Sequence, residues 1–272
     1  MSYLADFPAD VPDEPELVLC EREGDIVTLT LNRAEVMNCL SFPTLKRLRK
    51  LCHELASDLS VRAVLITGAG DKAFCAGADL KERKTMPLER VPHFVKNIRR
   101  VMDDVEALPQ PTIGLINGIA FGGGTELLLA CDLRIAAAHA QLGLTETSLA
   151  IIPGAGGTQR LPRLIGRARA KELILTARKI DAQEAERIGL VNRIAAAGAL
   201  RTTGLEVARA IAANGPVAVR AAKRAVDHGC ELPIKQGLEV EAACYELVLP
   251  TKDRLEALAA FSEKRAPKFS GS

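Results

Sequence analysis

The stretch that decides the fold of this chain is Asn117-Gly118-Ile119-Ala120-Phe121-Gly122-Gly123-Gly124-Thr125-Glu126. A short apolar strand precedes it and an apolar segment follows it, so the three glycines form a turn between a strand and a buried helix. Such a turn leaves backbone N–H groups uncovered in the first turn of the helix, where Glu126 also lies. The stretch therefore predicts an α/β protein with a carboxylate and free N–H donors at the start of one helix.

A second glutamate, Glu146, follows twenty positions later, in a segment that runs on to another glycine turn at Gly154. Two carboxylates held at separate turns could hold one water between them, with one acting as base and the other as acid. Each residue also has a plain interpretation when it is taken alone. Glu126 would then be an acid that interacts favourably with a helix dipole, Glu146 an exposed loop residue, and the glycines tight turns that need positive φ.

Short apolar strands and helices alternate on both sides of this stretch, which is typical of an α/β protein. The sequence predicts a hairpin around Gly24-Asp25 and then an amphipathic helix that Ser41 caps. Further strands are expected at 63–67, 111–118 and 132–136, with a helix at 122–131. The chain from residue 199 onward is expected to form only helices, at 200–213, 216–229, 233–248 and 251–264.

This pattern divides the chain into three parts. Residues 1–15, rich in proline and acidic residues, are expected to be a flexible lead-in. Residues 16–198 are expected to form a core of successive strand-strand-helix units. Residues 199–272 are expected to form an all-helical C-terminal region.

Composition and charge argue against several classes of protein. The 36 basic and 34 acidic side chains leave a net charge of +2, so no global field favours nucleic acid or an anionic membrane. The seven cysteines include no CxxC pair and the four histidines show no metal-ligand spacing. We therefore expect reduced thiols, no metal site and an enzyme without a cofactor.

The N-terminal sequence and the hydropathy of the chain give an expectation for its place in the cell. The N-terminus has the features of neither a secretory signal nor a typical mitochondrial presequence, and no apolar run is long enough for a membrane span. We expect a cytoplasmic protein, or a protein of the mitochondrial matrix if the chain is a processed form.

Several common motifs are incomplete. Residues 65–70 follow a strand but do not complete the GxGxxG of a dinucleotide site. Residues 154–158 lack the Gly-Lys-Ser/Thr of a P-loop, and the chain has no GxSxG elbow. These absences argue against a nucleotide oxidoreductase, an NTPase and a serine hydrolase.

Three glycine-rich motifs remain, and in this order they resemble those of the crotonase, or enoyl-CoA hydratase, superfamily. They are Phe74-Cys75-Ala76-Gly77-Ala78-Asp79-Leu80, the stretch 117–126, and Ile152-Pro153-Gly154-Ala155-Gly156-Gly157-Thr158-Gln159-Arg160-Leu161-Pro162. The resemblance covers about residues 17–269. It implies a crotonase-type spiral of strand-strand-helix units, followed by C-terminal helices that assemble a homotrimer or a hexamer.

The resemblance also implies roles for individual residues. Glu126 and Glu146 stand where family hydratases carry their base and their acid, and Ala78 and Gly123 match the two N–H donors of the oxyanion hole. Gly154 matches a position that helps to place the water or the acid. Retention of both glutamates favours hydration of an enoyl-CoA thioester, with an isomerase or a hydrolase as alternatives. No cofactor is implied, because coenzyme A is part of the substrate.

Contacts to coenzyme A are implied for Lys81, Phe261 and Lys264. The last two lie in residues 251–265, which match a helix that in the family often reaches the coenzyme A of a neighbouring subunit. A core aromatic and a solvated lysine are the plain alternatives, because such residues are ordinary on amphipathic helices.

Within the superfamily, residues 78–83, 170–174, 242–245 and 251–256 look most like the methylglutaconyl-CoA hydratase branch. That branch acts in leucine degradation on a substrate with a distal carboxylate, which would want a cation such as Lys81, Arg83 or Lys84. A general short-chain enoyl-CoA hydratase is the alternative.

The animal member of that branch is also described as binding RNA, through a basic helix that matches residues 45–51. An RNA-binding protein that retains the fold is therefore a further alternative. Phe42 is the only aromatic residue near this helix and the net charge is small, so stacking platforms for single strands are missing. We expect a solvated basic helix face instead.

Overall fold

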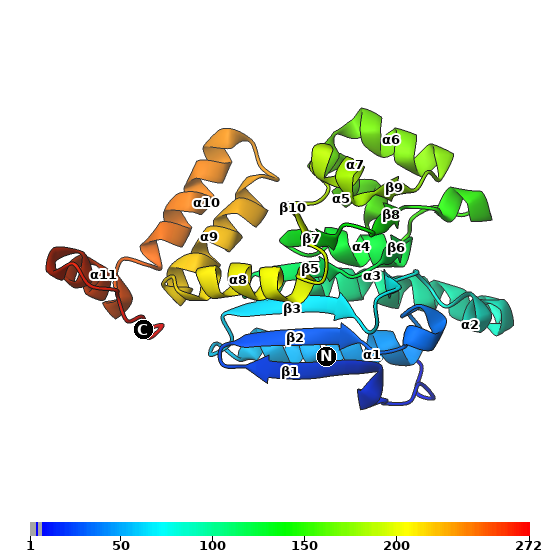
Figure 1. Ribbon diagram of the computed structural model, residues 1–272, viewed down its shortest axis with the longest axis horizontal. Coiled ribbons are helices and arrows are strands. Elements are labelled where there is room, and N and C mark those ends of the chain that lie inside the picture. The colour runs from blue at the N-terminus through cyan, green and yellow to red at the C-terminus, as the bar shows by residue number, and fades with distance from the viewer. Residues whose placement is uncertain (1–3, 5–6) are drawn as a thin grey trace.

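The computed structural model describes residues 4 and 7–272, which form two β-sheets and the helices around them (Figure 1). The larger sheet has the strand order β1-β2-β3-β5-β7-β10, with β1 (Val18–Glu23), β2 (Ile26–Leu31), β3 (Ala63–Gly68), β5 (Thr112–Ile116), β7 (Leu133–Ala137) and β10 (Arg193–Ala195). The smaller sheet has the order β4-β6-β8-β9, with β4 (Ala73–Cys75), β6 (Ile119–Phe121), β8 (Gln141–Gly143) and β9 (Ile180–Asp181). The pairs β1–β2 and β8–β9 are antiparallel, and the other pairs are parallel.

The helices lie between and outside the sheets. They are α1 (Phe42–Ser57), α2 (Leu80–Thr85), α3 (Val91–Glu106), α4 (Gly123–Leu129), α5 (Gly157–Ile165), α6 (Arg167–Thr176), α7 (Ala182–Arg187), α8 (Leu200–Ala212), α9 (Pro216–Gly229), α10 (Ile234–Glu246) and α11 (Lys252–Glu263). Short 3-10 helices are η1 (Pro15–Leu17), η2 (Ala34–Val36), η3 (Leu88–Arg90) and η4 (Glu146–Leu149). None of the helices in the described part of the chain is long and apolar enough to cross a bilayer.

The chain passes alternately through the two sheets. Strand β3 of the large sheet is followed by β4 of the small one, β5 by β6, and β7 by β8, and helices come after each pair. This is the predicted spiral of strand-strand-helix units, so the predicted α/β fold is confirmed. The four expected C-terminal helices are also present, as α8 to α11, with bounds that differ from the prediction by at most two residues.

Strand β3 is buried on both faces, as parallel strands usually are. Val64 and Ile66 point into the main core, whereas Ala63 and Leu65 point to the opposite side. There they pack with Leu205 and its neighbours on α8. Helix α8 therefore covers the outer face of the large sheet, although the sequence placed it in the C-terminal extension beyond residue 198.

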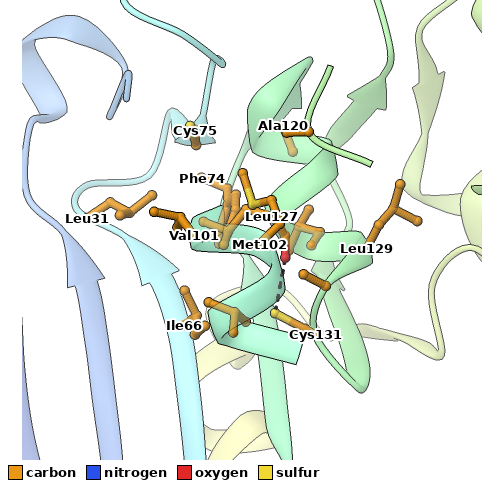
Figure 2. Close-up of a cluster of buried hydrophobic side chains, with 14 of the residues drawn as sticks. Leu31, Ile66, Phe74, Cys75, Val101, Met102, Ala120, Leu127, Leu129 and Cys131 are labelled. Atoms are coloured by element: carbon orange, nitrogen blue, oxygen red, sulfur yellow. Dashed lines mark hydrogen bonds between the residues drawn. The ribbon is translucent and has the colours of Figure 1, made fainter. Parts of the chain in front are cut away.

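Helices α3 and α4 fix the start of α4 against the core. Figure 2 shows Leu127 of α4 among Val101 and Met102 of α3 and Phe74 of β4, and all four side chains are fully buried. A core packed at this density resists small displacements. The first turn of α4 is therefore held in a fixed position relative to α3.

The expected lead-in packs against α1 from residue 7 onward, which differs from the predicted flexible segment. Phe7 and Val11 are buried and belong to the main core. Phe7 also meets the ring of Phe42 edge to face, with centroids 6.4 Å apart. Most of the residues before Phe7 lie outside the described part of the chain.

The basic face of α1 is occupied by the protein itself, so the prediction of a solvated face is wrong. Lys46 donates to the carbonyl oxygen of Val11 at 2.6 Å, and Lys50 pairs with Asp13 at 2.9 Å. Arg49 is buried and pairs with an aspartate of α3 at 2.6 Å. Since these cations serve contacts within the fold, the alternative of an RNA-binding helix loses its main support.

Asn117 joins two neighbouring turns of the spiral, between β5 and β6. Its Nδ2 donates to the carbonyl oxygens of Gly68, Gly70 and Ala73 at 2.9, 2.8 and 3.0 Å. Its Oδ1 accepts from the N–H of Gly68 at 3.2 Å. One side chain thus satisfies backbone groups at the turn between β3 and β4.

We expect Asn117→Ala to lower the free energy of unfolding by about 3 kcal/mol, because it leaves buried backbone groups without partners. Thermal unfolding should then move down by at least about 5 °C. The control is Asn214→Ala, which removes a single exposed hydrogen bond to Ala210. Equal shifts for the two variants would contradict the role given to Asn117.

Candidate active site

Close contacts on two sides require glycine at the turn that begins α4. Gly122 has φ +51°, and a Cβ there would lie 3.1 Å from Oε1 of Glu146. A Cβ on Gly124 would lie 2.0 Å from the carbonyl oxygen of Cys75, which no side chain could tolerate. The backbone of this turn therefore touches both β4 and the second glutamate.

The turn that carries Ala78 lies close to the start of α4. The backbone at Gly77 approaches α4 so closely that a Cβ there would lie 3.4 Å from the nitrogen of Gly123. Leu40 pairs with both sides of Ala78, since it donates to Gly77 and accepts from Asp79, and it leaves the Ala78 N–H unused. Within residues 7–272, the N–H groups of Ala78 and Gly123 donate to no protein acceptor.

Glu126 is 2% exposed, and one of its two carboxyl oxygens is held by hydrogen bonds. Its Oε1 accepts from the N–H groups of Ala155 and Gly157, both at 2.8 Å. The pKa of Glu126 is raised, because burial, the largest influence, outweighs the two N–H donors and the positive charge of Arg160, which lower it. Its Oε2 accepts no hydrogen bond from the described residues and is left for a ligand.

Glu146 is the first residue of η4 and is 9% exposed. Its Oε2 is buried and has no hydrogen-bond partner among the described residues. Burial, and then the negative charge of Glu126, raise the pKa of Glu146 to about 7. An unpartnered carboxyl oxygen of this kind indicates a functional group, because native proteins pair most buried polar atoms.

The two carboxyl groups have different environments, which separates their roles. Glu126 has two N–H donors from a neighbouring loop and a nearby cation to stabilise its anion, whereas Glu146 has only its own backbone N–H and lies near the negative charge of Glu126. Of the two carboxyl groups, Glu146 is therefore the harder to ionise. Pairs of carboxyl groups whose pKa values are pushed apart can divide acid and base chemistry between them.

The structure places Gly154 and Lys81, two further residues predicted for the site, in different surroundings. Gly154 lies one residue before Ala155, where its backbone passes Val95 of α3. Lys81 is exposed on α2, directly after the turn that carries Ala78. Gly154 therefore lies beside the loop that binds Glu126, whereas Lys81 makes no hydrogen bond or ion pair with either glutamate among the described residues.

Phe261 and Lys264 are not brought to this site by their own chain. Both belong to the end of α11, and Figure 1 shows α11 at the far end of the molecule from α2 and α4. Phe261 is 86% exposed, so the alternative of a core aromatic is wrong for this chain.

A model of the family described as enoyl-CoA hydratase/isomerase matches residues 21–272. The chain belongs to the enoyl-CoA hydratase/isomerase family. Methylglutaconyl-CoA hydratase of Homo sapiens, named as mitochondrial, is 49% identical over 272 residues, which cover 97% of this chain and 80% of the relative. A human enoyl-CoA hydratase domain-containing protein 2, also named as mitochondrial, is 46% identical over 250 residues, or 90% of this chain and 86% of the relative.

Solved structures agree with these sequence similarities. An enoyl-CoA hydratase from Bacillus anthracis has a TM-score of 0.93 and 53% sequence identity, covering 94% of this chain and 100% of that one. The crotonase fold and an activity of the enoyl-CoA hydratase type are therefore confirmed for this protein.

Two residues of the hydratase site carried no role in the sequence prediction. Thr125 donates its hydroxyl to the carbonyl oxygen of Ala120 at 2.6 Å and accepts from the N–H of Gly143 at 3.3 Å, which fixes the turn before Glu126. Arg160 contacts the loop that grips Glu126. Both lie inside the glycine-rich motifs, and that position is the signal that could have drawn attention to them.

The electrostatics of this hydratase predict a pH-dependent stability. The folded-state pKa of Glu146, about 7, lies above its ordinary value of 4.5. Its contribution to stability is therefore complete below about pH 4.5 and is lost as the pH rises through 7. The loss reaches up to about 3 kcal/mol, at roughly 1.4 kcal/mol per pKa unit.

We expect Glu146→Gln, which cannot ionise, to lose less thermal stability than the native protein between about pH 5 and pH 8. The measurement is the unfolding temperature across that range. The exposed Glu54→Gln serves as the control and should follow the native curve. Parallel curves for native protein and Glu146→Gln would show that the carboxyl group carries no such penalty.

Proposed function

We propose that this hydratase adds water across the 2,3 double bond of 3-methylglutaconyl-CoA. The observation that carries the hydration chemistry is the coupled pair Glu126 and Glu146, one gripped by N–H donors and one unpartnered. The substrate is suggested by relatives named methylglutaconyl-CoA hydratase, which are 48–49% identical over 97% of this chain.

In the proposed reaction, Glu126 takes a proton from water through its free Oε2 while the water oxygen bonds to C3. The electrons of the double bond move toward C2 and the thioester oxygen, and Glu146 then delivers its proton to C2. One water is added in all. The proton that Glu126 gains balances the one that Glu146 loses, so exchange of a proton between them or with solvent restores the starting state.

The thioester oxygen gains negative charge during this step and needs donors that are already in place. We assign this role to the N–H groups of Ala78 and Gly123, which have no partner within the described part of the fold. Donors that are fixed before the reaction pay no cost of reorganisation when the charge develops. The close approach of Gly77 to Gly123 supports the pairing of these two groups.

The proposal needs no cofactor, since coenzyme A enters as part of the substrate. Its place of action is proposed to be the cytoplasm or the mitochondrial matrix, and the human relatives named as mitochondrial support the second.

The distal carboxylate of this substrate needs a cation, and α2 offers three. Lys81, Arg83 and Lys84 follow the Ala78 turn directly. Arg83 is half-buried, with its guanidinium 5.3 Å from the centroid of the Phe94 ring, and pairs with no carboxylate of the described residues. A guanidinium held on an aromatic face in this way keeps its donors available, which favours Arg83 as the receptor.

Contacts with coenzyme A are proposed for Lys81 in its own subunit and for Phe261 and Lys264 in a neighbouring one. Exposed apolar side chains on the C-terminal helices support such an assembly, because a patch of this kind marks an interaction surface. They include Leu238, Tyr245, Leu255, Leu258 and Phe261. We propose a homotrimer, or a hexamer of two trimers.

We expect Glu126→Gln and Glu146→Gln each to lower kcat by at least about 100-fold, because each removes one proton transfer. Hydration of a 2-enoyl-CoA is followed by loss of the enoyl absorbance, with mass analysis of the product to distinguish water addition from isomerisation or thioester hydrolysis. Circular dichroism checks folding. Near-native turnover in either folded variant would remove that residue from the mechanism.

We expect kcat/KM for 3-methylglutaconyl-CoA to exceed that for crotonyl-CoA by at least about tenfold, the factor that roughly 1.4 kcal/mol provides. Arg83→Met should abolish this difference and leave crotonyl-CoA hydration unchanged. Lys84→Met, a cation of the same helix, is the control. Equal rates for the two substrates in the native enzyme would make it a general short-chain enoyl-CoA hydratase.

A further inference from the structure

Arg160 lies in the second turn of α5 and is bound on two sides. Its guanidinium pairs with Asp103 at 2.9 Å and with Glu106 through two bonds of 3.0 and 2.6 Å. Both acids belong to the last turn of α3. The side chain of Arg160 is only 15% exposed, whereas each acid is 51% exposed. The ion pairs therefore hold a largely buried arginine in one orientation.

The remaining donor of Arg160 faces the active site. Its Nη1 donates to the carbonyl oxygen of Ala155 at 3.1 Å. The N–H of Ala155 in turn donates to Oε1 of Glu126, together with the N–H of Gly157. Arg160 is therefore joined to the carboxyl group of Glu126 through a single residue of the loop.

Gly156 has the conformation and the space that this arrangement needs. Its φ is +109°, and a Cβ there would lie 2.0 Å from Nη1 of Arg160. A side chain at this position would expel the guanidinium from the loop. The glycine thus lets the loop direct the Ala155 carbonyl toward Arg160 and the neighbouring N–H groups toward Glu126.

We propose that Arg160 is a positioning residue for Glu126, which holds the loop 155–157 so that two N–H groups bind Oε1 and Oε2 stays free to act on water. This inference rests on the proposed role of Glu126 as the base. The ion pairs with α3 are part of the device, because they prevent the guanidinium from leaving the loop for solvent.

The charge of Arg160 acts in the same direction as its geometry. The positive charge of Arg160 opposes the rise in the pKa of Glu126 that burial causes, and so favours the ionised form of that carboxyl group. The other charged groups around this arrangement are Glu146 on η4, whose charge couples to Glu126, and Asp103 and Glu106 on α3, which are bound to Arg160. Removing the cation should therefore make Glu126 harder to ionise.

The test is Arg160→Met, with Arg163→Met as its matched control. Arg163 lies on the same helix and makes an exposed ion pair with Glu231, so the control loses a similar side chain away from the site. We expect Arg160→Met to lower kcat by at least about tenfold with a smaller change in KM, since misplacing a catalytic group costs rate. The acidic limb of the kcat/KM profile should also move to higher pH. Arg163→Met should keep the native kcat and the native limb.

Arg160→Lys separates the effect of the guanidinium geometry from the effect of the positive charge. Lysine keeps the cation but cannot bind Asp103, Glu106 and the Ala155 carbonyl together. We expect the acidic limb to stay at its native pH and kcat to fall several-fold. Native kcat in Arg160→Lys would overturn the positioning role, and it decides the matter even if Arg160→Met does not fold.

The variant Glu126→Gln distinguishes failure of the proposed base from failure of the proposed role of Arg160. Full activity in Glu126→Gln would remove the base itself, whatever Arg160 does. Loss of activity in Glu126→Gln together with native kcat and a native acidic limb in Arg160→Met would leave Glu126 as the base and overturn the inference about Arg160 alone.

Discussion

The close backbone approach of neighbouring spiral turns is the constraint on which the rest of this structure depends. At Gly118 an added Cβ would lie 2.2 Å from the carbonyl oxygen of Lys72, and at Gly124 it would lie 2.0 Å from that of Cys75. Because only glycine permits such approaches, the two sheets come together at the turn that begins α4. The same approach brings Gly77 beside Gly123, and the N–H groups of Ala78 and Gly123 have no acceptor among the described residues. The contacts that pack the two sheets together therefore also set the positions of these two N–H groups.

Burial of two carboxyl groups near this turn is unfavourable unless each charge is controlled. The fold controls the charges of the two carboxyl groups in different ways. Glu126 receives two N–H donors and the field of a fixed arginine, which favour its anion, while Glu146 has an unpartnered Oε2 and a pKa that burial and the charge of Glu126 raise to about 7. Strongly shifted pKa values of this kind gather at functional sites.

The basic helix α1 illustrates how a surface pattern can be misread. Its cations bind the N-terminal segment and α3 rather than solvent, and Phe7 closes the core from the same side. The C-terminal helices show the opposite case, because apolar residues of α10 and α11 stay exposed in the single chain. The two ends of the sequence thus serve different purposes, one completing the core and the other extending away from it (Figure 1).

The alternation of strands and helices and the four C-terminal helices could be predicted from the sequence, because apolar periodicity and glycine turns are local signals. The resemblance of three glycine-rich motifs indicated the family, and through it Glu126, Glu146, Ala78 and Gly123. How these groups are held became visible in the folded chain alone. The grip of Ala155 on Glu126 spans 29 positions and the pairing of Arg160 with Asp103 spans 57, and no local pattern encodes partners at such separations. The packing of α8 on the large sheet was likewise settled by long-range burial, since an amphipathic helix shows that it has an apolar face but not what covers it.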